Sequence, residues 1–520
     1  MKKKKQTPHI KQKAFRGRNI SSLESHDRKG KTVRSPWSKI PGPMQWSSWS
    51  GECIPNILWA CLLSAHLDRT KYLAHFRDVI IKAKRTLPNP KNHFITHNFL
   101  SLLTPDQFDQ IFDGVLKDDE ATQCLTPLRL ITSLPDNAHW ARRLEMPTGD
   151  IAGPKIAAAV ARTFDHQSER STDIRWMKLM YHIIAGRVSF PASMAGRLEE
   201  YRLYPDKGDM RAVRPSIRAT EIAFRQFEFG EEVPKGVKLP PGHQADFWRE
   251  MKARTQCIAP YEFKPPSRAS KEVVQELADI FRAVQDYFDD TATTTAPDAR
   301  HEGAFGITLY AISLCLNSAM GYGHEVVEGR IVLRTIVEAF ITLQYLASKD
   351  DPTLWQQYRQ YGTGQAKLAF LKNIREEKIP SFVDLKLMEQ LANEDMWMEF
   401  QDIQLGNWAN LNLRKMAEDA GVLSTYNKFY DWSSGYTHGH WVGVRSTVFV
   451  NCVNPLHRFH RVPAPPIVKM PSIIPDAAAL INGMLDTLSG LYPTFKPRLN
   501  LHKPAKAKRK KKTNAPSSSK

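Results

Sequence analysis

The chain has 520 residues, of which 42% are hydrophobic and 24% are charged, with 34 Pro and 27 Gly. This ordinary globular composition excludes a fully disordered chain, a collagen-like chain and a small disulfide-stapled domain. At roughly 150 residues per domain, the length predicts two to four domains with sizeable cores. The net charge of +19 lies at the two ends. Residues 1–39 hold 13 Lys and Arg against two acidic residues, residues 496–520 hold ten against none, and residues 40–495 carry 50 basic and 52 acidic residues.

Both terminal segments are rich in Lys, Ser and Pro and poor in apolar residues. Because such segments cannot offset their ordering entropy by burial, we predict disordered basic tails at 1–39 and 496–520. The clusters Lys2–Lys5 and Lys508–Lys512 suit phosphate backbones without reading base sequence. We therefore expect nucleic acid or another polyanion as partner. A role in solubility alone and a nuclear-localisation signal are the alternatives.

The cysteines favour a reducing cytoplasm, because most fall in apolar stretches and none has C-x-x-C spacing. The six are Cys53, Cys61, Cys124, Cys257, Cys315 and Cys452. No apolar run follows the basic N-terminus, so no signal peptide is predicted. Residues 303–323 lack charged side chains, but their polar residues and glycines favour a buried core helix over a membrane span. We expect a cytoplasmic protein without membrane contact.

The first half of the chain reads as helical after a Trp-rich entry at 37–49. Apolar periodicity predicts two helices within 54–85, joined near 69–71. Further helices are predicted at 105–115, 125–133, 152–164, 174–185, 193–203 and 209–228. We expect an N-terminal helical region over 40–240 and a loop or linker over 241–270.

The second half opens with a clean amphipathic helix, because apolar residues recur every three or four positions at Val273, Leu277, Ile280, Val284 and Phe288. An acidic, Thr-rich linker at 289–299 precedes three long predicted helices. These span 303–321, 324–348 and 352–374, and Asp351 caps the last of them with Pro352 at its first position. Shorter helices at 384–394 and 407–419, an undecided strand or buried helix at 442–453 and a last helix at 475–491 complete a C-terminal bundle over 271–495. The predicted fold class is all-α.

A charged pair inside an apolar helix face is the most informative local pattern. Arg334 and Glu338 share one face with apolar neighbours, and an unpaired buried charge costs several kcal/mol, so we expect the two to pair. Arg330 lies one turn earlier and Tyr358 lies on the next helix. Polar groups also crowd beside Gly and Trp in the segment FYDWSSGYTHGHWVGVR: Tyr430, Asp431, Ser433, Ser434, Tyr436, His438, His440 and Arg445. They form either a pocket wall or a polar network that fixes helix register.

Residues roughly 300–450 resemble an uncharacterised bacterial all-helical family, a domain of unknown function. That family carries an R-x-x-x-E element on a long helix and, some ninety residues on, an aromatic-x-x-S…H element. These elements fall here on Arg334 and Glu338, and on Tyr430, Ser433 and His438. The resemblance implies no established activity. It implies a setting in bacterial mobile-element or phage-defence (antiviral) loci.

A metal-independent ribonuclease needs His as acid or base and Arg to stabilise charge on the phosphate. The Arg-x(4–6)-His spacing typical of small helical nucleases occurs at Arg69…His75 and Arg175…His182, but chance alone predicts as many matches. We therefore place this hypothesis on Arg334, Glu338 and His438 as catalytic residues. The substrate-binding candidates are Arg330, Tyr358, Tyr430, Ser433 and Ser434.

Two other chemistries are weaker. His438, His440, His457 and His460 could bind a transition metal, but apart from Cys452 no acidic residue or cysteine stands at ligand spacing among them, so no metal is predicted. Ser433 and Ser434 lie outside any G-x-S-x-G motif, and no Walker or dinucleotide motif is present, so no cofactor is predicted.

Two function hypotheses follow. The first is a non-enzymatic or regulatory module that associates with nucleic acid through its tails. The alternative is a ribonuclease-type defence effector that uses the Arg334, Glu338 and His438 site.

Overall fold

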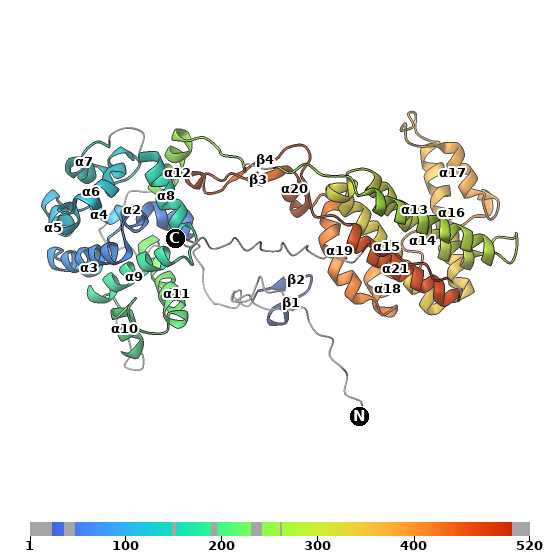
Figure 1. Cartoon of the computed structure of the whole chain (residues 1–520), viewed down its shortest axis with the longest axis horizontal. Helices are drawn as coiled ribbons and strands as arrows, with labels where there is room; N and C mark the ends of the chain where they lie inside the picture. Colours follow the sequence, from blue (N-terminus) through green and yellow to red (C-terminus); the bar gives the residue numbers. More distant parts are fainter. Residues whose placement is uncertain are drawn as a thin grey trace, which may run out of the picture. The chain divides into compact units, whose positions relative to one another are not determined.

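The computed structural model describes residues 23–35, 47–147, 152–188, 195–229, 242–260, 263–493 and 495–501. Helices dominate these residues, with two short antiparallel strand pairs, which confirms the all-α prediction. The chain forms two compact units (Figure 1). The first comprises residues 1–256 and Asn454–Arg458, and the second comprises residues 257–453 and 459–520. The predicted tail clusters Lys2–Lys5 and Lys508–Lys512, and Trp37 and Trp46, lie outside the described residues.

The first unit begins with a short helical turn, η2 (Leu23–Ser25), and a β-hairpin of β1 (Asp27–Lys29) and β2 (Thr32–Arg34). In the hairpin, Arg28 lies opposite Val33, and Gly30 adopts φ +61°, which the tight turn requires. This ordered hairpin lies within the segment that composition predicted to be disordered, 1–39.

The helical body of the first unit packs α2 against α8 and α9, α3 against α5 and α9, and α11 against α9. Its core gathers large aromatic side chains, among them Trp59, Trp140 and Trp176. The helices longer than one turn are α2 (Leu58–His66), α3 (Arg69–Thr86), α5 (Pro105–Leu116), α6 (Asp119–Leu125), α7 (Asn137–Arg143), α8 (Ala152–Phe164), α9 (Glu169–Ile184), α10 (Ala195–Arg202), α11 (Met210–Phe229) and α12 (His243–Arg254). The short turns are η4 (Trp49–Cys53), α1 (Ile54–Asn56), η5 (Pro90–Asn92), α4 (His97–Leu100), η6 (Thr126–Leu130) and η10 (Pro455–His457).

Two boundary predictions differ from the structure. Residues 241–270 were expected to be a linker, but His243–Arg254 form α12, because Phe247, Trp248 and Met251 give it an apolar face that is buried in the first core. Leu456, just over 200 residues further on, is also buried in that core. The first unit therefore takes a short piece of chain from the C-terminal half.

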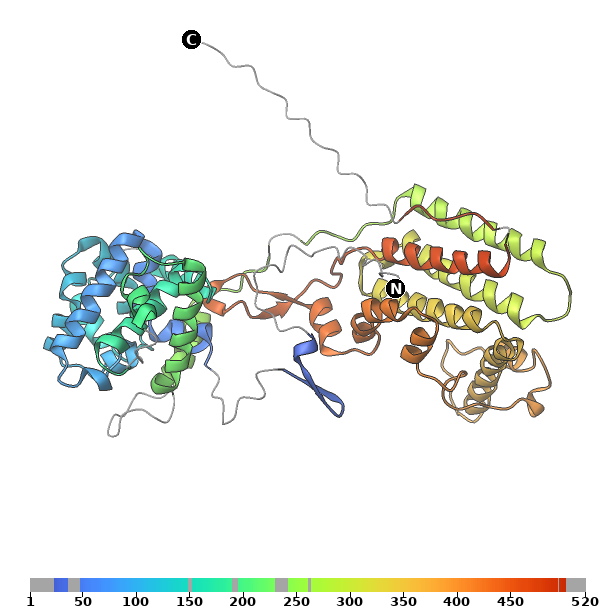
Figure 2. The same cartoon turned by 90° about the horizontal axis from the view of Figure 1, so that it is seen from below.

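The second unit is a helical bundle around two long apolar helices, α14 (Ala299–Met320) and α15 (Val327–Lys349). α13 (Lys271–Thr291) is the predicted amphipathic helix, with Leu277, Ile280 and Val284 buried, and it packs against α14. α21 (Ile474–Leu491) packs against both α14 and α15 (Figure 2). The remaining elements are η8 (Gly323–Glu325), α16 (Pro352–Asn373), α17 (Leu385–Ala392), η9 (Met398–Phe400), α18 (Leu413–Asp419), α19 (Leu423–Thr437), α20 (Trp441–Val448), β3 (Phe449–Asn451) and β4 (Arg461–Pro463).

Capping explains how these helices begin where they do. The Asp351 carboxylate accepts a hydrogen bond from the Thr353 amide at 2.8 Å, with Pro352 at the first helical position. The segment predicted as a strand or a buried helix, 442–453, is a largely exposed helix followed by a strand, since α20 ends at Val448 and β3 follows at once.

α14 and α15 are long and apolar enough to cross a membrane by length and composition alone. Half of the apolar stretch of each helix is buried, and both helices supply the core of the second unit.

Candidate functional site

The predicted Arg334–Glu338 pair forms on α15. The Arg334 side chain is 6% exposed and makes an ion pair with Glu338, one turn further along the helix, whose side chain is 44% exposed. The guanidinium carbon of Arg334 lies 3.6 Å from the centre of the Tyr430 ring, which α19 brings alongside α15. Tyr430 stacks in turn on Tyr426 with ring centres 4.4 Å apart. The Glu338 carboxylate and the face of the Tyr430 ring together hold the Arg334 guanidinium in place.

Two nitrogens of this arginine, Nε and Nη1, form no hydrogen bond among the described residues, although Nη1 makes the ion pair with Glu338. Arg334 Nε is buried and has no hydrogen-bond partner among the described residues. Most buried polar groups are hydrogen-bonded, so such an atom marks either a strained contact or a position that a ligand or water completes.

A cleft of about 400 Å³ opens beside this pair, between α14, α15 and α16. Glu338 belongs to both, since it binds Arg334 and also lines the cleft. The walls are mostly apolar, with two carboxylates and a few hydroxyl groups. The lining residues are Glu302, Gly303, Gly306, Ile307, Tyr310, Thr335, Glu338, Ala339, Thr342 and Tyr358.

Two glycines on one turn of α14 make room for the cleft. A Cβ atom on Gly303 would lie 3.0 Å from the Trp355 ring, whereas one on Gly306 would meet nothing within 4 Å. Gly303 therefore allows α16 to pack closely, and Gly306 leaves open space. Substitution at Gly306 is a means of filling the cleft without disturbing the bundle.

The far wall of the cleft comes from α16. Tyr358 is half-buried, its ring packs edge-on against Trp408 at 5.2 Å, and burial raises the pKa of its hydroxyl. Arg359 pairs with Glu302 and, at 2.7 Å, with Asp395. Each cleft carboxylate thus already has an arginine partner, so the cleft suits a ligand with an apolar body and a few polar groups.

The other predicted site residues serve the helices themselves. Arg330 Nη2 donates to the Pro471 carbonyl at 2.6 Å, and burial lowers the pKa of this arginine. Ser433 Oγ donates to the Phe429 carbonyl at 2.6 Å within α19. Ser434 is half-buried, and its carbonyl accepts a hydrogen bond from the His438 amide at 3.1 Å.

His438 lies at the exposed C-terminal end of α19, with its ring 5.8 Å from that of His440. Eight residues of helix separate it from Tyr430, a rise of about 12 Å along the axis. The structure thus brings Arg334, Glu338 and Tyr430 together and places His438 at a different level of the same helix. The catalytic grouping of His438 with Arg334 stays a prediction.

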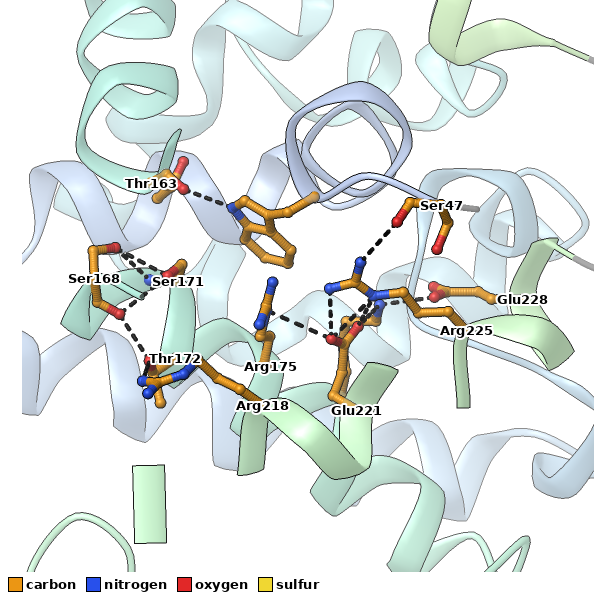
Figure 3. A network of polar contacts seen from close by, with 12 residues as sticks. Ser47, Thr163, Ser168, Ser171, Thr172, Arg175, Arg218, Glu221, Arg225 and Glu228 are labelled. Carbon is orange, nitrogen blue, oxygen red and sulfur yellow. Dashed lines mark hydrogen bonds and ion pairs between the residues drawn. The ribbon is translucent and has the colours of Figure 1, made fainter. Parts of the chain in front are cut away.

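The two Arg…His spacing matches of the first unit hold structural contacts. Arg69 Nε donates to Asp173 at 2.9 Å, and His75 Nε2 lies 3.1 Å from Asp118. Arg175 belongs to a buried network of five charged side chains between α9 and α11, which pattern reasoning missed (Figure 3). The five residues are Arg175, Lys178, Glu221, Arg225 and Glu228.

Glu221 is the centre of this network. Lys178 Nζ lies 2.8 Å from Glu221 and 2.7 Å from Glu228, and Arg225 Nη2 lies 2.8 Å from Glu221. Burial opposes ionisation of Glu221, but Lys178 and Arg225 outweigh it and hold its pKa far below the usual range. The Arg175 guanidinium lies 4.5 Å from the Trp49 ring, and burial lowers its pKa to about 10. The charges are enclosed, so the network fixes how α9 and α11 pack.

The local signals were Arg and Lys at i, i+3 on α9 and Glu, Arg and Glu at i, i+4, i+7 on α11. Each pattern alone is ordinary for a solvated helix face. The charged residues form a buried network only because these faces of α9 and α11 pack against each other.

The Arg334 stack, the whole of α15 to α20 and most of the residues that line the cleft fall inside one stretch of sequence that matches a family model. Residues 307–452 match the model of a family of unknown function (DUF5677). No match was found among curated proteins or among solved structures. The DUF5677 segment begins within α14 and ends at Cys452, just after β3, and it contains every predicted site residue. This finding confirms the resemblance to an uncharacterised family over part of the chain.

Proposed function

We propose that the protein is a cytoplasmic, nucleic-acid-associated module, regulatory or structural in role, that contacts phosphate groups through its two basic terminal segments, 1–39 and 496–520. One observation carries the proposal: the two segments hold a balance of +11 and +10, while the 456 residues between them are close to neutral. Such clustered charge releases counterions from a phosphate backbone on binding, irrespective of base sequence.

The hairpin of β1 and β2 supports this proposal from the described part of the basic segment. Arg28, Lys29, Lys31 and Arg34 are all exposed. Arg28 Nε donates to the Gly30 carbonyl at 3.1 Å, which still leaves guanidinium donors for a phosphate. The hairpin therefore presents four exposed cations within seven residues, distributed over both of its faces.

The bodies of the two units differ in charge. Residues 40–256 carry 29 Lys and Arg against 25 Asp and Glu, whereas residues 257–495 carry 21 against 27. A polyanion is therefore attracted to the first unit and repelled by the second. We expect the first unit to supply the additional contacts.

The test is fluorescence anisotropy with labelled duplex DNA and single-stranded RNA over a range of salt concentrations. Changing Lys508, Arg509, Lys510, Lys511 and Lys512 together to Gln should lower the salt-dependence slope by up to about 4 units. A matched variant with Arg at the four lysine positions keeps the charge and should bind like the wild type. An unchanged slope in the Gln variant would contradict the proposal. Equal binding of heparin would identify a general polyanion site.

Metal-independent ribonuclease activity is the second hypothesis. Its support is Arg334, which Glu338 and Tyr430 hold in place and whose Nε atom has no partner among the described residues. We rank it second because one phosphate would have to reach both Arg334 and His438, about 12 Å of helix away from the Tyr430 contact. Purified wild type and His438→Ala are incubated with total RNA in EDTA. Cleavage by the wild type alone would establish the activity and the role of His438.

A further inference from the structure

We propose that Cys257, Cys452 and His460 of the second unit bind a structural Zn²⁺ ion. Their sulfur and ring-nitrogen atoms lie within 4.8 Å of one another. Cys257 Sγ lies 3.2 Å from His460 Nε2. A tetrahedral zinc with ordinary Zn–S and Zn–N bonds separates such ligands by about 3.5 Å, so only a small adjustment is needed.

The β3–β4 hairpin places two of these ligands opposite each other. The register pairs Asn451 with Arg461. The next pair, toward the loop that joins the two strands, is therefore Cys452 and His460. The Cys452 amide donates to the His460 carbonyl at 2.7 Å, which continues the ladder by one rung. Directly opposed residues of an antiparallel pair point to the same face, so the thiol and the imidazole converge.

The third ligand arrives from the start of the second unit. The Ile258 carbonyl accepts a hydrogen bond from the Val453 amide at 2.8 Å, which fixes the segment that carries Cys257 beside the hairpin. The Ile258 amide also donates to Cys452 Sγ at 3.3 Å. Hydrogen bonds of this kind orient the ligands of metal sites from the outside.

The chemistry of the set favours zinc over other ions. Thiolate and imidazole ligands in tetrahedral arrangement are typical of structural zinc sites, whereas Ca²⁺ and Mg²⁺ require oxygen ligands. Neither cysteine forms a disulfide. Zinc would pin residues 257–258 to the hairpin of β3 and β4, whose first strand lies at the end of the DUF5677 segment.

The first measurement is the zinc content of the purified full-length protein by elemental mass spectrometry. We expect about one Zn²⁺ per chain in the wild type and at least a tenfold loss in Cys257→Ala/Cys452→Ala and in His460→Ala. Cys257→His keeps a zinc ligand at an exposed position and should retain the metal. The control is His438→Ala/His440→Ala, which removes the exposed His-x-His pair and should keep full zinc content. Zinc in the double cysteine variant, or none in the zinc-supplemented wild type, would overturn the proposal.

A second measurement needs no variant and so does not depend on correct folding of a mutant. The wild type is treated with N-ethylmaleimide before and after a zinc chelator, and each cysteine is followed by mass spectrometry. Cys257 should react at least tenfold faster once zinc is removed, while the buried Cys315 should stay unreactive in both states. Equal reaction of Cys257 in the two states would overturn the proposal.

Discussion

The two units handle buried charge in opposite ways. In the first unit, Arg175, Lys178 and Glu221 are almost completely enclosed, and each carboxylate meets its cations inside the core. In the second unit, the ion pair joins the buried Arg334 to a half-exposed Glu338 that borders a cleft. An enclosed network can only hold helices in register, whereas a pair at a cleft wall can exchange its partner for a ligand. The Arg334–Glu338 pair at the cleft is therefore the better candidate for a functional site.

The largest expected effect tests the enclosed network. Glu221→Gln removes the charge that three buried cations share, and we expect it to lower the free energy of unfolding by about 3–5 kcal/mol. Urea denaturation followed by circular dichroism measures this. Glu199→Gln is the control, because Glu199 pairs with Arg202 on the surface and its loss should leave the midpoint unchanged. A midpoint shift no larger than that of the control would show that the network is dispensable.

A second buried group of the first unit makes its stability depend on pH. His243 is 4% exposed, its ring nitrogens have no hydrogen-bond partner among the described residues, and burial lowers its pKa from 6.5 to about 3. The unfolded chain therefore binds a proton below pH 6.5 that the folded chain does not, and stability falls as the pH drops toward 3. His243→Leu should remove this loss, worth about 2 kcal/mol at pH 5 and little at pH 7. The urea unfolding midpoints of the wild type and His243→Leu at pH 5 and pH 7 measure this difference. A gain that is the same at both would refute the linkage.

The aromatic contact of the second unit should have a smaller effect. Tyr430→Leu removes the ring that covers Arg334 and should cost about 1 kcal/mol, whereas Tyr430→Phe keeps the ring and should cost less. Thermal unfolding of the two variants measures the difference. Equal losses would assign the effect to the hydroxyl group instead of the ring.

The smallest effect completes the comparison. Glu338→Gln changes the same chemical group as Glu221→Gln, also four residues from an arginine, but in a half-exposed position. Water screens this pair, so we expect a loss below about 1 kcal/mol. A loss as large as that of Glu221→Gln in the same denaturation assay would mean that the cleft pair is structural.

Apolar periodicity predicted the bounds of single helices and the residue pairs within them. It did not predict which residues of different helices come into contact. The three long helices of the second unit were predicted to within a few residues, because apolar spacing and the Asp351 cap are local. The pairing of Arg334 with Glu338 was predicted for the same reason. Gly306 and Tyr310 of the cleft were missed, because nothing in their own helix indicates that α16 lies across from them. Cys257 was missed as a partner of Cys452, since 194 residues separate the two in the chain.

Leu456 has a consequence for how the protein is made. It is buried in the core of the first unit, so that core is incomplete when residue 256 leaves the ribosome. At the usual rate of translation, about 5–20 residues per second, the missing residue follows roughly 10–40 s later. During that interval the nascent first unit exposes an unfilled apolar site next to α8 and α12, where η10 will dock. A fragment cut at residue 256 keeps that exposure permanently and is predicted to aggregate where the full chain does not.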